Sequence, residues 1–172
     1  MFKKILILGF VICIILLIFI VETNNNIKDA VNLWCDHEDQ ANHFFGHISE
    51  WDVSRVTDMS NLFEKKIKFN NNISNWDVSN VTNMRYMFYK AESFNQPLNN
   101  WNVSNVTNMS YMFYEAKSFN QPINNWDVSN VTNMSYMFYS AESFNQEINT
   151  KTVTNKDKGT YYAWDVSNVT KM

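Results

Sequence analysis

The sequence is poor in the residues that build catalytic loops. Among its 172 residues there are only three glycines and three histidines, and prolines number two. No nucleophile elbow, phosphate-binding loop, kinase motif set or metalloprotease motif is present. We therefore predict that the chain is not an enzyme and carries no cofactor. Asparagine must make many of the turns instead, because it tolerates left-handed backbone and forms side-chain turns.

Cysteine and basic residues are also scarce. Of the two cysteines, Cys13 lies inside an apolar run and Cys35 lies outside it, so we expect no disulfide between them. Lysine and arginine total 14 against 17 acidic residues, which gives a net charge of −3. Nucleic-acid binding needs clustered positive charge. The composition therefore predicts no nucleic-acid partner.

What the sequence does contain is a repeat of 25 residues. Trp51, Trp76, Trp101 and Trp126 each open a block of the form WDVSNVTNM, and Trp164 opens a fifth block after a longer gap. A fixed period of this size predicts a solenoid, in which each unit buries its apolar face by stacking on its neighbours.

Each repeat has two kinds of apolar spacing. Residues 125–128 alternate polar and apolar side chains, which predicts a short strand. Met134, Phe138 and Ala141 recur every three or four residues, which predicts a short helix. Stacked strands lie about 4.8 Å apart and packed helices about 8–10 Å apart, so the solenoid should bend with its strands inside. We predict an α/β repeat with short parallel strands on the concave side and short helices on the convex side.

The repeats predict a division of the chain into four parts. Residues 1–22 form a signal anchor or signal peptide, and residues 23–50 form a helical cap in which Trp34 covers the first repeat. Residues 51–150 hold four repeats, and residues 151–172 hold a hairpin insertion followed by an incomplete fifth repeat. The hairpin is either a contact element or a tolerated insertion.

The N-terminal segment has the charge pattern of a membrane-targeting sequence. Lys3 and Lys4 precede an apolar run over residues 5–21, which as a helix would span roughly 26 Å. Two interpretations stand: an uncleaved transmembrane helix, or a cleaved signal peptide. In the first case the chain is anchored in the membrane with its repeats outside the cytoplasm, and in the second it is secreted or held at the cell surface.

The repeat motifs resemble a known family. W-D-V-S-N-V-T-N-M, M-F-Y-x-A and F-N-Q-P-[IL]-N-N, over about residues 46–172, are similar to the BspA-like leucine-rich-repeat family of bacterial surface proteins, which includes the 25-residue repeats of mycoplasma-type lipoproteins. The resemblance implies a right-handed, leucine-rich-repeat-like solenoid at the cell surface or secreted, and no established activity. Val81 replaces the usual buried asparagine, so we expect no asparagine ladder.

One polar column is a candidate ligand-binding surface. Its members share the position after the repeat tryptophan: Asp52, Asp77, Asn102, Asp127 and Asp165. Stacked carboxylates can bind calcium or another ligand. Each side chain can instead accept hydrogen bonds from the following turn, and Asn102 favours that interpretation because it lacks the charge. We therefore predict no metal in this column.

Two further groups of residues raise the same choice between function and structure. Cys35, His37, His43 and His47 are zinc-ligand types, but their spacing matches no familiar zinc module, so we expect packed or solvated cap residues. The paired tyrosines of the M-F-Y segments suit recognition if they lie at the surface, although packing in columns is the favoured role.

The sequence thus predicts a membrane-tethered extracellular repeat module that recognises a protein or a glycan without catalysis, through its concave face and hairpin. The alternative is a passive structural surface module, or a fragment of a longer array, with no specific ligand. The last repeat reaches Met172 before an M-F-Y-x-A segment, so its uncovered end is also a candidate for end-to-end self-association.

Overall fold

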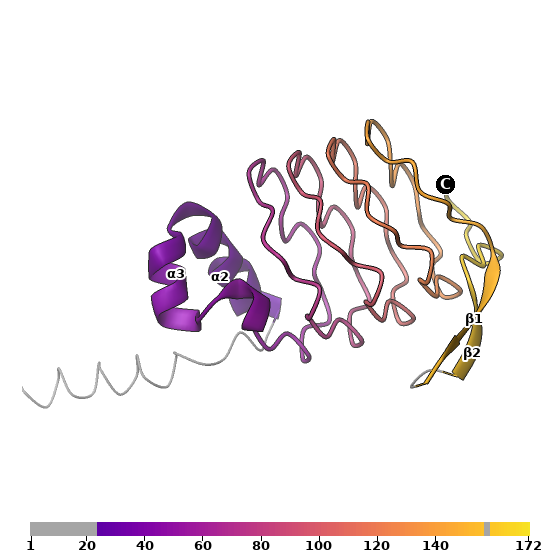
Figure 1. Cartoon of the computed structure of the whole chain (residues 1–172), viewed down its shortest axis with the longest axis horizontal. Helices are drawn as coiled ribbons and strands as arrows, with labels where there is room; N and C mark the ends of the chain where they lie inside the picture. The colour runs from indigo at the N-terminus through magenta and orange to yellow at the C-terminus, as the bar shows by residue number, and fades with distance from the viewer. Residues whose placement is uncertain (1–23, 157–158) are drawn as a thin grey trace, which may run out of the picture.

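The computed structural model describes residues 24–156 and 159–172. Two helices, α2 (Asn24–Asp36) and α3 (Glu38–Phe45), stand at one end, and a 3-10 turn at Ile48–Glu50 leads into a row of stacked loops (Figure 1). We call these loops coils 1 to 4, at residues 51–75, 76–100, 101–125 and 126–150. An antiparallel hairpin of β1 (Lys151–Asn155) and β2 (Gly159–Ala163) follows, and residues 164–172 begin a fifth coil.

The predicted leucine-rich-repeat-like solenoid, with strands on one side and helices on the other, is wrong. Coils 1 to 4 contain neither a helix nor a strand. At the positions expected to form strands, such as residues 125–128, the chain has no regular element, and the coils instead share isolated parallel bridges farther along each repeat, such as Asp58 with Asn83 and Asn83 with Asn108. Where helices were expected, the chain makes a series of turns.

The backbone of the M-F-Y segments explains why no helix forms. Tyr86 and Lys90 adopt left-handed conformations, with φ of 58° and 56°. In an α-helix each N–H donates to the carbonyl four residues earlier. Here the Tyr86 N–H donates to Ser110 O at 3.0 Å, and the Phe88 N–H donates to Met112 O at 2.9 Å. Hydrogen bonds to the next coil therefore replace those of a helix.

Columns of equivalent aromatic side chains form the core. The rings of Phe63, Phe88, Phe113 and Phe138 stack in order, with centroids 5.3, 5.4 and 5.6 Å apart. The buried tryptophans that open coils 2 to 4 each donate their indole N–H to a carbonyl 28 residues earlier, as Trp126 does to Leu98 O at 2.9 Å. The tryptophan rings are thus buried with their indole N–H groups hydrogen-bonded. Together with the phenylalanine rings, they make the aromatic columns the main source of stability.

The segment predicted as a helical cap contains α2 and α3. Ile27, Val31 and Trp34 lie on one face of α2 and are buried. The Trp34 ring contacts the Trp51 ring edge to face, with centroids 5.9 Å apart, and its indole donates to Asn71 Oδ1 at 3.1 Å. Trp34 therefore covers the first tryptophan of the stack.

The hairpin lies where threonine-, valine- and tyrosine-rich runs predict one. β1 and β2 pair from Lys151 with Ala163 to Asn155 with Gly159. The Tyr161 hydroxyl donates to Asn125 O at 2.6 Å, which ties the hairpin to coil 3.

The transmembrane helix of the predicted architecture is not among the described elements. Within residues 24–156 and 159–172, no helix is both long enough and apolar enough to cross a membrane. The predicted anchor at residues 5–21 lies outside this part of the chain. A transmembrane helix is therefore not a feature of the described fold.

Candidate functional site

Two rows of stacked tyrosines run along the coils, and we call them together the tyrosine face. The first row is Tyr86, Tyr111 and Tyr136, and the second is Tyr89, Tyr114 and Tyr139. Centroids of neighbouring rings lie 4.7 and 5.1 Å apart in the first row, and 4.9 Å apart at both steps of the second. The coil repeat therefore places six phenol rings in a regular array.

The first row is held by an uncommon backbone conformation. Tyr86, Tyr111 and Tyr136 have φ of 58°, 59° and 56°, in the left-handed region that bulky residues rarely occupy. Such a conformation costs on the order of 1–3 kcal/mol and persists only where the surrounding structure enforces it. Hydrogen bonds from the Tyr86 N–H to Ser110 O and from the Tyr111 N–H to Ser135 O enforce it in coils 2 and 3, so these two rings are already ordered before any ligand arrives.

The tyrosine face changes in character along the stack. At coil 2 the Arg85 guanidinium lies 4.6 Å from the centre of the Tyr86 ring, and the Lys90 ammonium lies 5.5 Å from that of Tyr89. Such cation–π contacts contribute about 0.5–1 kcal/mol at exposed sites. At coil 4, Tyr136 and Tyr139 are 55% and 53% exposed, and within residues 24–156 and 159–172 neither ring has a cation–π contact. The Lys90 ammonium also pairs with Glu115 Oε1 at 3.4 Å. The face therefore carries cation–π contacts at coil 2 and is open and aromatic at coil 4.

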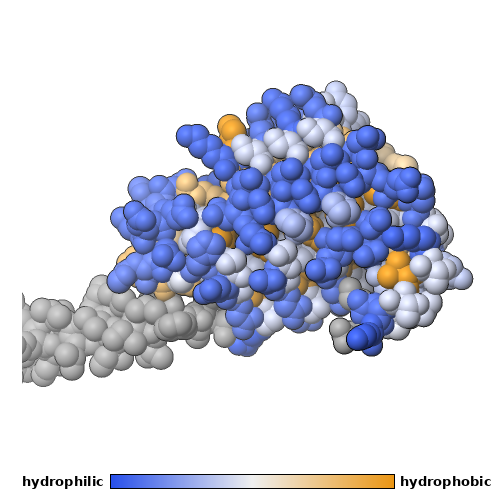
Figure 2. All heavy atoms as spheres, in the orientation of Figure 1, coloured by the Kyte–Doolittle hydropathy of each residue, from blue (hydrophilic) through white to orange (hydrophobic). Residues whose placement is uncertain are grey.

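The surrounding surface is mostly polar. Figure 2 shows hydrophilic residues over most of the visible side of the coils, with hydrophobic residues in small separate patches. Large exposed apolar patches mark many binding sites. The side of the coils seen in Figure 2 shows no large patch of this kind.

The predicted aspartate column forms turns. Every member accepts a hydrogen bond from the N–H of the serine two residues later, at these distances: Asp52 3.0 Å, Asp77 3.0 Å, Asn102 3.3 Å, Asp127 3.1 Å and Asp165 3.0 Å. Hydrogen bonds from the Ser54 side chain and backbone lower the pKa of Asp52, and those from the Ser167 backbone and side chain lower that of Asp165. Asn102 accepts the same hydrogen bond without a charge. The hydrogen bond therefore stabilises the turn and does not require a carboxylate. A ligand at the column remains a prediction.

The other candidate metal ligands do not converge. In the described part of the chain, no group of three or more histidine, cysteine, aspartate and glutamate side chains could hold a metal ion. His47 Nδ1 accepts a hydrogen bond from the Ser49 N–H at 3.3 Å, and its ring packs on Trp34 with centroids 5.1 Å apart. His43 packs on Phe44.

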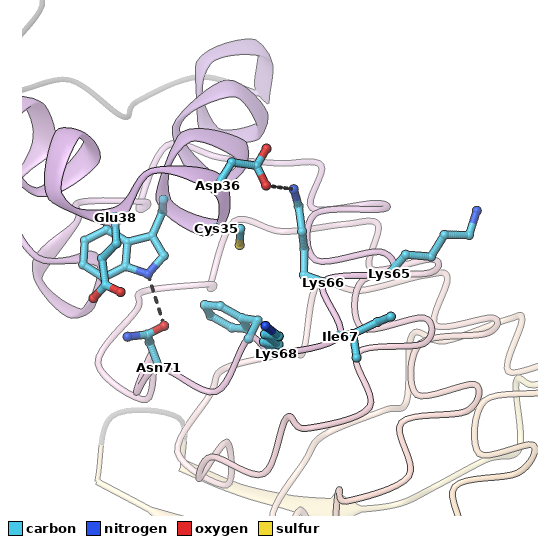
Figure 3. Close-up of a pocket in the computed structure, with 10 residues that line it drawn as sticks. Cys35, Asp36, Glu38, Lys65, Lys66, Ile67, Lys68 and Asn71 are labelled. Carbon is cyan, nitrogen blue, oxygen red and sulfur yellow. Dashed lines mark hydrogen bonds and ion pairs between the residues drawn. The ribbon is translucent and has the colours of Figure 1, made fainter.

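A hollow of about 400 Å³ lies between the cap and coil 1 (Figure 3). Cys35 and Asp36 line it from α2, and Lys65, Lys66 and Lys68 line it from coil 1. Lys66 Nζ lies 3.5 Å from Asp36 Oδ1, which joins the two walls. Burial raises the pKa of the Cys35 thiol to about 11, so at neutral pH it is not a thiolate nucleophile.

The sequence held one sign of the tyrosine face that our predictions did not use. Asn61 occupies in coil 1 the position of Tyr86 in coil 2, and it has φ of 61°. Asparagine is enriched several-fold in the left-handed region, whereas it is unremarkable within a helix. An asparagine in register with the tyrosines thus pointed to a turn at this position.

The comparisons with known proteins find one family. The model of the family described as "Mycoplasma protein of unknown function, DUF285" matches residues 35–152, more than half of the 172-residue chain. No curated protein and no solved structure matches the chain.

Proposed function

Since the chain belongs to the DUF285 family, whose function is not known, we propose from its geometry that it is a non-catalytic recognition module. Its ligand is a protein or a glycan, and it binds to the tyrosine face outside the cytoplasm. The observation that carries this proposal is the regular array of six tyrosine rings in two rows along the coils.

The chemistry of tyrosine supports a binding role. A tyrosine ring supplies a large, rigid contact area at a low cost in conformational entropy, and its hydroxyl can donate or accept a hydrogen bond. Tyrosine and arginine are also enriched among residues that dominate binding energy at protein interfaces. Arg85, which donates to the Tyr86 hydroxyl at 3.2 Å, adds a fixed positive group beside the first row.

Pre-organisation supports the same role. Ordering a flexible side chain on binding costs about 0.5–1.5 kcal/mol. Neighbouring rings and the left-handed backbone already order Tyr111 in the unbound chain. The tyrosine face therefore loses little entropy when a ligand binds.

The placement outside the cytoplasm rests on the sequence. Lys3 and Lys4 lie before the apolar run at residues 5–21, and this order of charge and apolar residues favours export of the repeats. The motifs that resemble BspA-like surface proteins favour a role at the cell surface.

A binding experiment with a matched control tests the proposal. The full chain is applied to a glycan array and to immobilised extracellular proteins, beside a triple variant with Tyr86→Asn, Tyr111→Asn and Tyr136→Asn. Asparagine occupies the same left-handed position at Asn61, so the variant should fold. Tyr162→Asn, on the hairpin and 63% exposed, is the control. We expect saturable binding that weakens at least about ten-fold only in the triple variant.

The passive structural module is the competing outcome of that experiment. If no glycan or protein binds saturably, or if the triple variant and the Tyr162→Asn control bind alike, the tyrosine rows serve only to pack the coils together. The proposed recognition role would then be wrong.

A further inference from the structure

Coil 1 departs from the repeat in one short stretch beside the cap. At the four residues after M-F-Y-x, coils 2 to 4 read AESF, AKSF and AESF, whereas residues 66–69 of coil 1 read KIKF. Lys66, Ile67 and Lys68 therefore stand where the other coils have alanine, a charged residue and serine. All three line the hollow of about 400 Å³ between the cap and coil 1, which we call the cap–coil hollow.

Contact with the cap accounts for two features of this stretch. Lys66 Nζ lies 3.5 Å from Asp36 Oδ1 at the end of α2. Asn71, at a position where the later coils have glutamine, accepts the Trp34 indole N–H at 3.1 Å. Coil 1 packs on the cap where the other coils pack on a preceding coil, so these two residues have a structural role.

The same explanation does not cover Ile67 and Lys68. The Ile67 side chain is 53% exposed, although it is large and apolar. The Lys68 side chain is exposed and makes no ion pair or hydrogen bond to any residue within 24–156 and 159–172. An exposed apolar side chain and an exposed lysine contribute little to folding, because neither leaves water when the chain folds. Their place at the hollow points to a ligand.

The cap side of the hollow carries the opposite charge. Glu38, the first residue of α3, lines the hollow, is exposed and makes no ion pair in the described part of the chain. Figure 3 shows Glu38 on the cap side, and Ile67 and Lys68 on coil 1. Since Lys66 is paired with Asp36, the charges left for a ligand are the carboxylate of Glu38 and the ammonium of Lys68.

This arrangement selects a ligand that carries both charges. A carboxylate accepts hydrogen bonds from an ammonium group, and a lysine ammonium donates them to a carboxylate. A ligand with a single charge would use only one of Glu38 and Lys68. The exposed Ile67 adds an apolar contact, and the hollow has a volume within the range of about 300–1,000 Å³ typical of small-molecule sites.

We propose that the cap–coil hollow binds a short peptide with free termini and an apolar side chain. Its carboxylate pairs with Lys68, its ammonium group pairs with Glu38, and its side chain packs on Ile67. Capture of a free peptide terminus is a recurring mode of peptide recognition. The hollow includes no residue of the tyrosine face, so this site is independent of the proposed recognition role of that face.

A set of related dipeptides tests the proposal. Alanyl-leucine is titrated into the full chain while NMR follows the Ile67 methyl groups and the Trp34 indole N–H, which both belong to residues that line the hollow. We expect saturable shifts of both signals. Acetylation of the amino terminus or amidation of the carboxyl terminus should each weaken binding at least about three-fold, because each removes one charged hydrogen bond. The dipeptide blocked at both ends should not bind.

The repeat itself supplies matched variants. Lys68→Ser and Ile67→Glu place in coil 1 the residues that coil 2 carries at Ser93 and Glu92, so both variants should fold. Each should weaken binding of alanyl-leucine at least about three-fold. Lys156→Ser removes an exposed lysine outside the hollow and is the control, with no change expected.

Four outcomes would overturn the proposal. They are the absence of saturable binding, equal binding of the doubly blocked dipeptide, shifts that spare Ile67 and Trp34, and equal affinity in Lys68→Ser and the Lys156→Ser control. Binding that Tyr111→Asn abolishes and Lys68→Ser leaves unchanged would place the peptide on the tyrosine face instead. None of the first four results bears on the recognition role of the tyrosine face, so the two proposals fail separately.

Discussion

The two ends of the stack carry similar coils but bury them differently. At the cap end Phe63 is fully buried, and Trp34 covers Trp51. At the other end Phe138, the last member of the same column, is only partly buried, and Tyr139 is 53% exposed. The repeat sequence is nearly the same at both ends of the stack. Burial therefore depends on what lies on the far side of a coil as much as on the residue itself.

The largest predicted effect compares the two ends of the phenylalanine column. Phe63→Ala removes a buried ring that stacks on Phe69 and Phe88, with centroids 4.0 and 5.3 Å away, and should lower the free energy of unfolding by about 3–5 kcal/mol. Phe138→Ala removes a ring that is already partly hydrated, so its cost should be roughly half as large. Denaturant unfolding measures the free energy of both variants. Equal losses of free energy would show that the two phenylalanines are not buried differently.

The sequence predicts which repeat positions are buried, but not the backbone conformation between them. The 25-residue period identified Trp51, Trp76 and Trp101 as equivalent buried residues, and all three are buried. Spacing by three and four residues also gave the buried side chains Met134 and Met137, yet it was misread as a helix. A tight turn with alternating handedness buries the same positions, and periodicity alone does not separate the two.

The backbone conformation of the tyrosine face was missed for a different reason. It depends on the direction of backbone N–H groups, which side-chain spacing does not report. The left-handed φ of Tyr86 becomes intelligible only when its N–H is seen to donate to Ser110 O in the next coil. Contacts between coils, rather than local propensity, decide this conformation.

Local backbone strain should be alike at the two ends, although burial differs. Lys65 in coil 1 and Ser140 in coil 4 occupy equivalent positions, with φ of 59° and 54°. Lys65→Gly and Ser140→Gly should each raise the free energy of unfolding by about 0.5–1 kcal/mol, because glycine adopts this conformation without steric cost.

Ser135 provides the control for these glycine variants, because it is not among the residues with positive φ. Ser135→Gly should be destabilising by roughly 0.5 kcal/mol in the same unfolding assay. If Ser140→Gly also proves destabilising, the left-handed assignment at the open end is wrong.

The serine turns should be insensitive to charge. Asp127 accepts hydrogen bonds from the Ser129 N–H at 3.1 Å and from its hydroxyl at 2.7 Å, and Asn102 makes the equivalent pair in coil 3. Asp127→Ala should lower the free energy of unfolding by about 0.5–1.5 kcal/mol, and Asp127→Asn by only a few tenths. A large loss with asparagine, or calcium binding by calorimetry that Asp127→Asn abolishes, would restore the carboxylate column as a ligand site.

The last prediction concerns chemical reactivity, not stability, at the end covered by the cap. Burial raises the pKa of Cys35 from 9.0 to about 11, so its thiolate fraction at pH 8 should be about 100-fold lower than in the unfolded chain. In a Cys13→Ser background, alkylation by iodoacetamide should be correspondingly slow and should accelerate in urea. Equally fast alkylation of the folded chain would show that the cap does not bury this thiol.

The central claim is that the M-F-Y segments bond to the next coil and do not form helices. Scalar couplings across hydrogen bonds, measured by NMR, identify the acceptor of each N–H directly. We predict a coupling from the Phe113 N–H to the carbonyl carbon of Met137, whose oxygen lies 2.9 Å from the Phe113 nitrogen. A coupling from the Phe113 N–H to the carbonyl of Met109, four residues earlier, would contradict the account.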